Sequence, residues 1–181
     1  MLNIILLAAA AIVVLLLIIV ATRPSDFRVT RTGRIAAPLA VVFDNVNDLH
    51  KWEAWSPWAK LDPNAKSTYS GPISGAGSSM AWAGNNKIGQ GRMTITDSRP
   101  GEKVQFRLEF LKPFKATNTA EFTFKSEGEQ TAVTWSMFGK NNFMGKVIGL
   151  FMNCDKMVGG QFEQGLANLD SISQQGAVAQ K

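Results

Sequence analysis

The feature that most constrains this chain is an uncharged apolar run near its N-terminus. Residues Ile4–Ala21 are 18 consecutive residues without a charge, nearly all Ile, Leu, Val or Ala. At a helical rise of about 1.5 Å per residue the run spans about 27 Å, close to the thickness of the hydrocarbon core of a bilayer. The run therefore predicts a membrane-spanning anchor, which we place at residues 2–22.

A cleaved signal peptide is the alternative interpretation of this run. Such a peptide carries basic residues before the apolar stretch and a small-x-small cleavage site after it. No Lys or Arg precedes Ile4, and Val20-Ala21-Thr22 is a poor cleavage site. We therefore expect a single-pass anchor that stays in place.

Charges on the two sides of the run predict its orientation. Arg23, Arg28, Arg31 and Arg34 follow the run, and no basic side chain precedes it. The positive-inside rule then places the large domain on the cytoplasmic side, unless these arginines only decorate the solvated face of a strand. The lone Cys154 excludes an internal disulfide and agrees with a reducing compartment.

The basic balance of the chain does not predict a nucleic-acid partner. The formal net charge is +5, but Lys and Arg are scattered and interleaved with Asp and Glu. Nucleic-acid binding proteins concentrate their basic side chains in a patch or stripe. Attraction of the arginines after the anchor to anionic lipid headgroups is the better expectation.

The rest of the chain reads as an antiparallel sheet with one apolar face. In "KVQFRLEF" Val104, Phe106, Leu108 and Phe110 alternate with polar residues, and "AEFTFK" and "AVTWSM" repeat the pattern. This alternation is typical of strands covered on one face only. "FRVTRTGRI" predicts a further strand with a bulge at Gly33.

Helical patterns frame the strands. Pro38 opens one short helix, a second short helix or turn runs from Leu49 to Trp55, and apolar residues at three- and four-residue steps from Val158 to Ile172 predict a long amphipathic helix. We expect a linker at 23–26, one domain at 27–174 and a flexible tail at 175–181. A sheet curved around one long helix leaves a hollow, the kind of place where ligands bind.

Several stretches of the chain resemble a known superfamily. "RIAAPLAVVFDNVNDLHKWEAWSPW", "GAGSSMAWAG", "FLKPFKATNTAEFTF" and "FMNCDKMVGGQFEQGLANL" are similar to the START-like, helix-grip proteins, and within them to the polyketide cyclase/dehydratase group called SRPBCC proteins. The resemblance covers about Asp26 to Ser173. It implies an α+β helix-grip fold, with a curved seven-stranded antiparallel sheet wrapped on the C-terminal helix and an apolar cavity between them. Members mostly bind lipids or other hydrophobic molecules, and some catalyse ring closure or dehydration. No catalytic motif runs through the superfamily, so no catalytic residue is assigned.

The candidate ligand-binding residues are apolar or aromatic side chains expected on the inner face of the sheet, near its first helices or on the long helix. Filled-core packing is the alternative for each. The set is Trp58, Tyr69, Trp82, Phe106, Leu108, Trp135, Met137 and Phe162.

Signs of an enzyme are scarce in the sequence. His50, the only histidine, has no positioned partner predicted and reads as a surface or capping residue. One His and one Cys do not make a conventional zinc site, so we expect no metal, and no cofactor. "GAGSSM" has Met80 where a dinucleotide fingerprint needs its third glycine.

Two further features need an explanation. Gly159, Gly160 and Gly165 lie inside the long helix, where each costs about 1 kcal/mol relative to Ala. Close packing against the sheet, or a bend that leaves room for a ligand, would offset this cost.

The segments "LKPFK", with Phe114 between two lysines, and "NNFMGKVIGLFM" suit a membrane interface, or simply a surface loop and a buried helix start.

The sequence thus favours a membrane-anchored binder of a hydrophobic small molecule or lipid, with no nucleic-acid partner. The first alternative is an enzyme of the cyclase/dehydratase kind, which needs an acid or base facing the cavity. The second is a protein-interaction module with a filled core, comparable to a chaperone cofactor.

Overall fold

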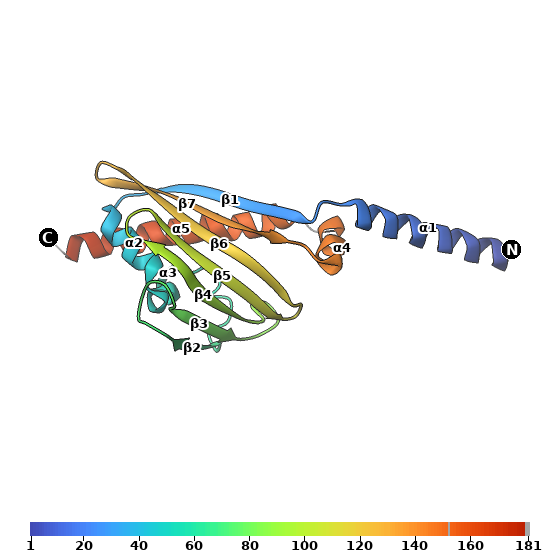
Figure 1. Cartoon of the computed structure of the whole chain (residues 1–181), viewed down its shortest axis with the longest axis horizontal. Coiled ribbons are helices and arrows are strands. Elements are labelled where there is room, and N and C mark those ends of the chain that lie inside the picture. Colours follow the sequence, from blue (N-terminus) through green and yellow to red (C-terminus); the bar gives the residue numbers. More distant parts are fainter. Residues whose placement is uncertain (152, 180–181) are drawn as a thin grey trace.

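The structure is a computed structural model of the chain, and it describes residues 1–151 and 153–179. Helix α1 (Leu2–Thr22) projects from one end of the domain (Figure 1). Among the described residues it is the one helix long and apolar enough to cross a membrane. Its Thr22 hydroxyl donates to the carbonyls of Ile18 and Ile19, so the helix end keeps its hydrogen bonds within itself.

The domain is built on one antiparallel sheet of seven strands, as the resemblance implied. The strands are β1 (Asp26–Ile35), β2 (Lys66–Ser70), β3 (Ser79–Ala83), β4 (Gln90–Arg99), β5 (Lys103–Lys112), β6 (Ala116–Glu127) and β7 (Gln130–Lys140). They lie in the order β1-β7-β6-β5-β4-β3-β2, so the first two strands form the two edges. Neighbours along the chain therefore pair through hairpins, except that β1 crosses to join β7.

The expected bulge at Gly33 is wrong. β1 pairs with β7 without a register shift, from Asp26 opposite Lys140 to Ile35 opposite Thr131. The two-residue period therefore continues through Gly33, and Arg31 lies on the same face as Val29. Gly33 has a packing role instead, because a Cβ added there would lie 3.3 Å from the Cβ of Leu166. The register shifts of this sheet lie between β4 and β5.

The first helices close one end of the sheet. They are α2 (Leu39–Asn47), the short 3-10 turn η1 (Leu49–Lys51) and α3 (Trp52–Trp55). Trp52 and Trp55 are buried, and their indole N–H groups donate to the carbonyls of Val46 and Asn45. These bonds satisfy the polar edges of two large rings, so both indoles can lie inside the apolar core.

Helix α4 (Phe143–Phe151) and helix α5 (Cys154–Ala179) complete the fold. Figure 1 shows α5 crossing the sheet and α4 beside the base of α1. Residues 175–179, expected in a flexible tail, are helical in α5. Ala177 packs against the core there, which gives the last turns a reason to stay helical. Residues 180–181 lie outside the described residues.

Candidate functional site

The register of the strands divides the inner face of the sheet into rows. The outermost row contains Phe110, Ala116 and Trp82; the second contains Phe27, Asn118, Leu108 and Tyr69; the third contains Val29, Met137 and Phe106; and the fourth contains Arg31, Trp135 and Phe122. The first two rows lie toward α1 and form what we call the open end. The fourth row and those beyond it lie under α2 and α3 and form the closed end.

The closed end is filled by aromatic rings. Trp135 stacks on Phe162 of α5 at 4.2 Å between ring centroids and on Phe122 at 4.6 Å. Trp52 and Trp55 meet the same indole edge-on at 6.1 and 5.7 Å. Each such pair adds about 0.5–1.5 kcal/mol beyond the burial of apolar area, so the rings stabilise this end of the domain.

One polar atom in this aromatic cluster lacks a partner. Trp135 is 2% exposed, and its indole Nε1 has no hydrogen-bond acceptor among the residues that the structure describes. A buried donor left unpaired costs about 1–3 kcal/mol. An oxygen brought in by a ligand or a buried water would relieve that cost.

The open end contains a cleft of about 730 Å³. Phe27, Phe110, Ala116 and Asn118 of the sheet line one side, and Met144 and Ile148 of α4 face them. Met157 at the start of α5 and Phe114 at the β5–β6 tip border it as well. The volume suits a drug-sized or lipid-like molecule, and the walls are largely apolar.

A few polar side chains border this cleft. Asn118, Asn141 and Asn142 contribute amides, and Lys115 and Lys140 contribute positive charge. Glu109 is the one carboxylate among the described lining residues, and it forms an ion pair with Arg107 at 3.0 Å. A site of this composition can hold an apolar body and orient a polar or anionic head at the rim.

The eight candidate residues fall into three groups in the structure. Phe106, Trp135 and Phe162 are buried in the core, with Trp58 packed against Trp135 and Phe162. Half-buried Leu108 and Met137 lie between that core and the cleft, and Leu108 pairs with the cleft residue Asn118. Half-buried Trp82 lies beside the cleft in the outermost row, where its ring meets that of the cleft residue Phe110 at 6.0 Å. Tyr69 lies on β2, at the far edge of the sheet.

Tyr69 belongs to a separate cluster on that edge. Its ring stacks on His50 at 4.1 Å, and His50 Nδ1 lies 3.0 Å from Asp48 Oδ1. Asp48 also accepts the backbone N–H of His50, which makes it the cap of η1. Burial, and next the negative charge of Glu53, raise the pKa of Tyr69. This cluster lies across the sheet from the cleft.

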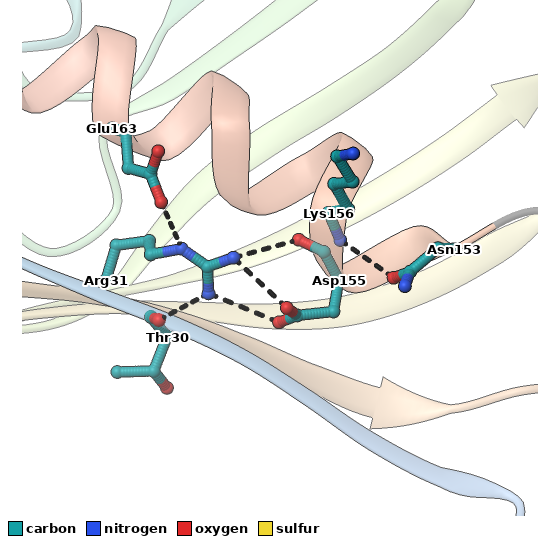
Figure 2. Close-up of polar contacts among 6 residues, drawn as sticks. All are labelled: Thr30, Arg31, Asn153, Asp155, Lys156 and Glu163. Atoms are coloured by element: carbon teal, nitrogen blue, oxygen red, sulfur yellow. Dashed lines mark hydrogen bonds and ion pairs between the residues drawn. The ribbon is translucent and has the colours of Figure 1, made fainter.

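Arg31 is the residue of this face that sequence patterning missed. Its guanidinium reaches α5, where Nε donates to Glu163 at 2.6 Å and the two terminal nitrogens donate to Asp155 at 3.1 and 3.2 Å (Figure 2). Arg31 also donates to the carbonyl of Thr30 at 2.8 Å. The bond from Arg31 lowers the pKa of Asp155, and Asp155 and then Glu163 raise the pKa of Arg31.

The helix glycines have three different surroundings. A Cβ on Gly159 would overlap the Arg31 guanidinium, and one on Gly165 would lie 2.6 Å from the Trp135 ring and 3.2 Å from Pro57. A Cβ on Gly160 would meet nothing within 4 Å. Close packing therefore accounts for Gly159 and Gly165, while Gly160 has no packing reason to be glycine.

The comparison with protein families gives the chain a place. The family described as polyketide cyclase / dehydrase and lipid transport matches residues 26–173. The chain belongs to this family. Membership in the polyketide cyclase / dehydrase and lipid transport family supports the binding of hydrophobic ligands in general. No curated protein sequence matches the chain.

Several solved structures share the fold of this chain at low sequence identity. Major latex-like protein 151 from Panax ginseng aligns with a TM-score of 0.59 at 12% identity, over 82% of this chain and 98% of its own. Protein Ms6760 from Mycobacterium smegmatis gives 0.57 at 19%, over 80% and 89%. Protein CV1439 from Chromobacterium violaceum gives 0.57 at 12%, over 83% and 98%. These likenesses show the helix-grip fold.

Proposed function

We propose that this protein is a membrane-anchored binder of a lipid or similar hydrophobic molecule. The observation that carries the proposal is the cleft at the open end, which continues the apolar inner face of the sheet at the end from which α1 projects. A ligand with an apolar chain would lie against Phe27 and Phe110, with Leu108 and Met137 next along the face toward Trp135.

The anchor would supply the ligand from the membrane that holds the protein. α1 is 21 residues long, which spans about 30 Å as a helix and matches the hydrocarbon core of a bilayer. We place the domain on the cytoplasmic side, because basic side chains gather at the end of the domain nearest to α1. They are Arg23, directly after the helix, and the exposed Lys112, Lys115 and Lys140. Extraction of membranes with alkaline carbonate should leave the intact chain in the pellet.

Binding rather than acid–base catalysis fits the chemistry of the cleft. A general acid or base needs a titratable group with a shifted pKa within reach of the substrate. The carboxylate of Glu109 at the cleft instead forms an ion pair with Arg107. Amides and lysines at the rim favour recognition of a polar head.

Photo-cross-linking tests the proposal on the full chain in lipid vesicles. A long-chain fatty acid carrying a diazirine should attach to peptides containing Asn118 and Met137. Ala116→Phe should lower this labelling strongly, because the new ring fills the cleft. Thr123→Phe is the matched control, since Thr123 lies exposed on the same strand and should leave the labelling unchanged. If the inner face of the wild-type protein takes up no label, the binder proposal is wrong and the interaction-module alternative replaces it.

A further inference from the structure

Exposed apolar side chains of the domain concentrate at one place. In the part of the chain that the structure describes, six large hydrophobic residues beyond the N-terminal segment Met1–Thr22 are exposed, and one of them, Ile73, lies away from the other five. The other five form what we call the docking surface: Leu111, Phe114, Phe143, Met144 and Met157, which are 45–54% exposed. They come from the β5–β6 tip and, about 30 residues later in the sequence, from α4 and the start of α5.

The docking surface lies next to the C-terminal end of α1. Helix α4 packs beside α1, and Lys146 of α4 donates to the carbonyl of Ala21 at 3.4 Å. Val20 in that last part of α1 is buried. The β5–β6 tip joins α4 through Asn142, whose amide donates to the carbonyl of Lys115 at 3.4 Å. A bilayer spanned by α1 would therefore begin next to α4 (Figure 1).

Basic side chains surround the apolar ones. Lys112 and Lys115 flank Phe114 at the tip, and Lys140 ends β7 at the same end of the sheet; all three are exposed. Lysines at the edge of an inserted apolar surface extend to the headgroups, where they are attracted to an anionic membrane. This arrangement of charge around apolar residues suits a lipid surface better than a second protein core.

We propose that the docking surface inserts into the headgroup region of the leaflet that α1 enters. This inference rests on the proposed membrane anchoring and adds a second contact with the same bilayer. Leu111, Phe114, Met144 and Met157 also line the cleft, so docking places the mouth of the cleft against lipid. A lipid would then enter the cleft without crossing water.

An environment-sensitive probe on the full chain tests the inference. In a Cys154→Ser background, Phe114→Cys and Met144→Cys are labelled with NBD and reconstituted into nanodiscs that hold one copy each. Glu129→Cys in the β6–β7 turn, at the opposite end of the sheet, is the control position. The expected result is a blue-shifted emission at positions 114 and 144, quenched by lipids brominated near the headgroup, and an unshifted emission at position 129.

A charge variant separates the role of the lysines. Lys115→Glu should reduce the blue shift on discs that contain phosphatidylserine, while Lys125→Glu, on the exposed outer side of β6, should not. Equal emission at positions 114, 144 and 129 in a chain that resists carbonate extraction overturns the docking and leaves the anchor standing. A chain released by carbonate overturns the anchor itself. A shift seen only when two copies share one disc assigns the surface to a second copy and also overturns the inference.

Discussion

The open and closed ends of the sheet are made by the same strands with the same alternation, and yet only one of them is filled. At the closed end Trp52 and Trp55 reach in from α3, and Phe162 comes down from α5 onto Trp135. At the open end α4 contributes Met144 and Ile148 to the cleft wall and leaves a space between itself and the sheet. The helices that cover the sheet, and not the sheet itself, decide which part of its inner face can hold a ligand.

The boundary between the two ends is marked by a charge. Arg31 lies in the same row as Trp135 and ties β1 to Asp155 and Glu163 of α5. We call these ion pairs the clamp. On the side of the clamp that lies toward α1, the start of α5 borders the cleft. The clamp therefore fixes how closely the first turns of α5 approach the open end.

The strongest test of the comparison removes the centre of the closed end. Trp135→Ala should lower the free energy of unfolding by about 3–5 kcal/mol, because the ring is buried and stacked on two sides. Chemical unfolding of the full chain in nanodiscs, followed by circular dichroism, measures the loss. Leu111→Ala at the open end is the control, and it should change stability by less than about 0.5 kcal/mol because its side chain is exposed. Equal losses would show that the two ends do not differ.

A second test uses the helix glycines. Gly165→Ala should cost about 1–3 kcal/mol, since the new Cβ would meet the Trp135 ring where it has no room to move. Gly160→Ala, five residues earlier on the same helix, should instead stabilise by up to about 1 kcal/mol, because nothing lies near its Cβ. Opposite signs in a thermal unfolding experiment support close packing at Gly165. Two stabilising substitutions would contradict it.

The smallest expected effect is the loss of the Asp155–Arg31 ion pair at low pH. The Arg31 bond gives Asp155 a pKa in the folded state that is lower than in the unfolded chain, where an aspartate has a pKa of about 3.9. Its contribution to stability is therefore present above that pH and is lost as the pH falls through the folded pKa. Asp155→Asn should make the start of α5 exchange its amide hydrogens faster at neutral pH. The stabilities of wild type and variant should begin to converge as the pH falls below about 4 and should meet once the pH lies below the folded pKa of Asp155.

Hydrogen exchange also shows where the Asp155 effect ends. Faster exchange should be confined to the first turns of α5 and should be absent around Leu169, which is fully buried under the closed end. Exchange that rises along the entire helix would mean that the clamp supports the whole domain.

Much of this fold could be predicted from the sequence, because alternation in a stretch such as Val104–Phe110 has one structural solution. Arg31 was missed for a physical reason: an inner face is recognised by its apolar residues, and alternation does not show that a charged side chain shares that face when Asp155 and Glu163 of α5 pair with it. The extent of the cleft could not be predicted, because Phe106 and Leu108 alternate identically while only Phe106 is fully buried. Which of the two side chains is covered by an aromatic ring and which borders open space depends on helices that are distant in the chain.

The crossover of β1 to β7 also has a consequence for how the protein is made. Thr30 and Ser136 exchange a side-chain hydrogen bond across this pair, although they lie 106 residues apart in the sequence. Pairings between such distant segments form late in folding. During synthesis, the strand joined directly to the anchor therefore waits without its partner until β7 has left the ribosome, and only then can α5 cover the apolar face. A chain cut short before Gln130 would leave that strand unpaired next to the membrane, so completion of the C-terminal part is what turns the anchored segment into a folded domain.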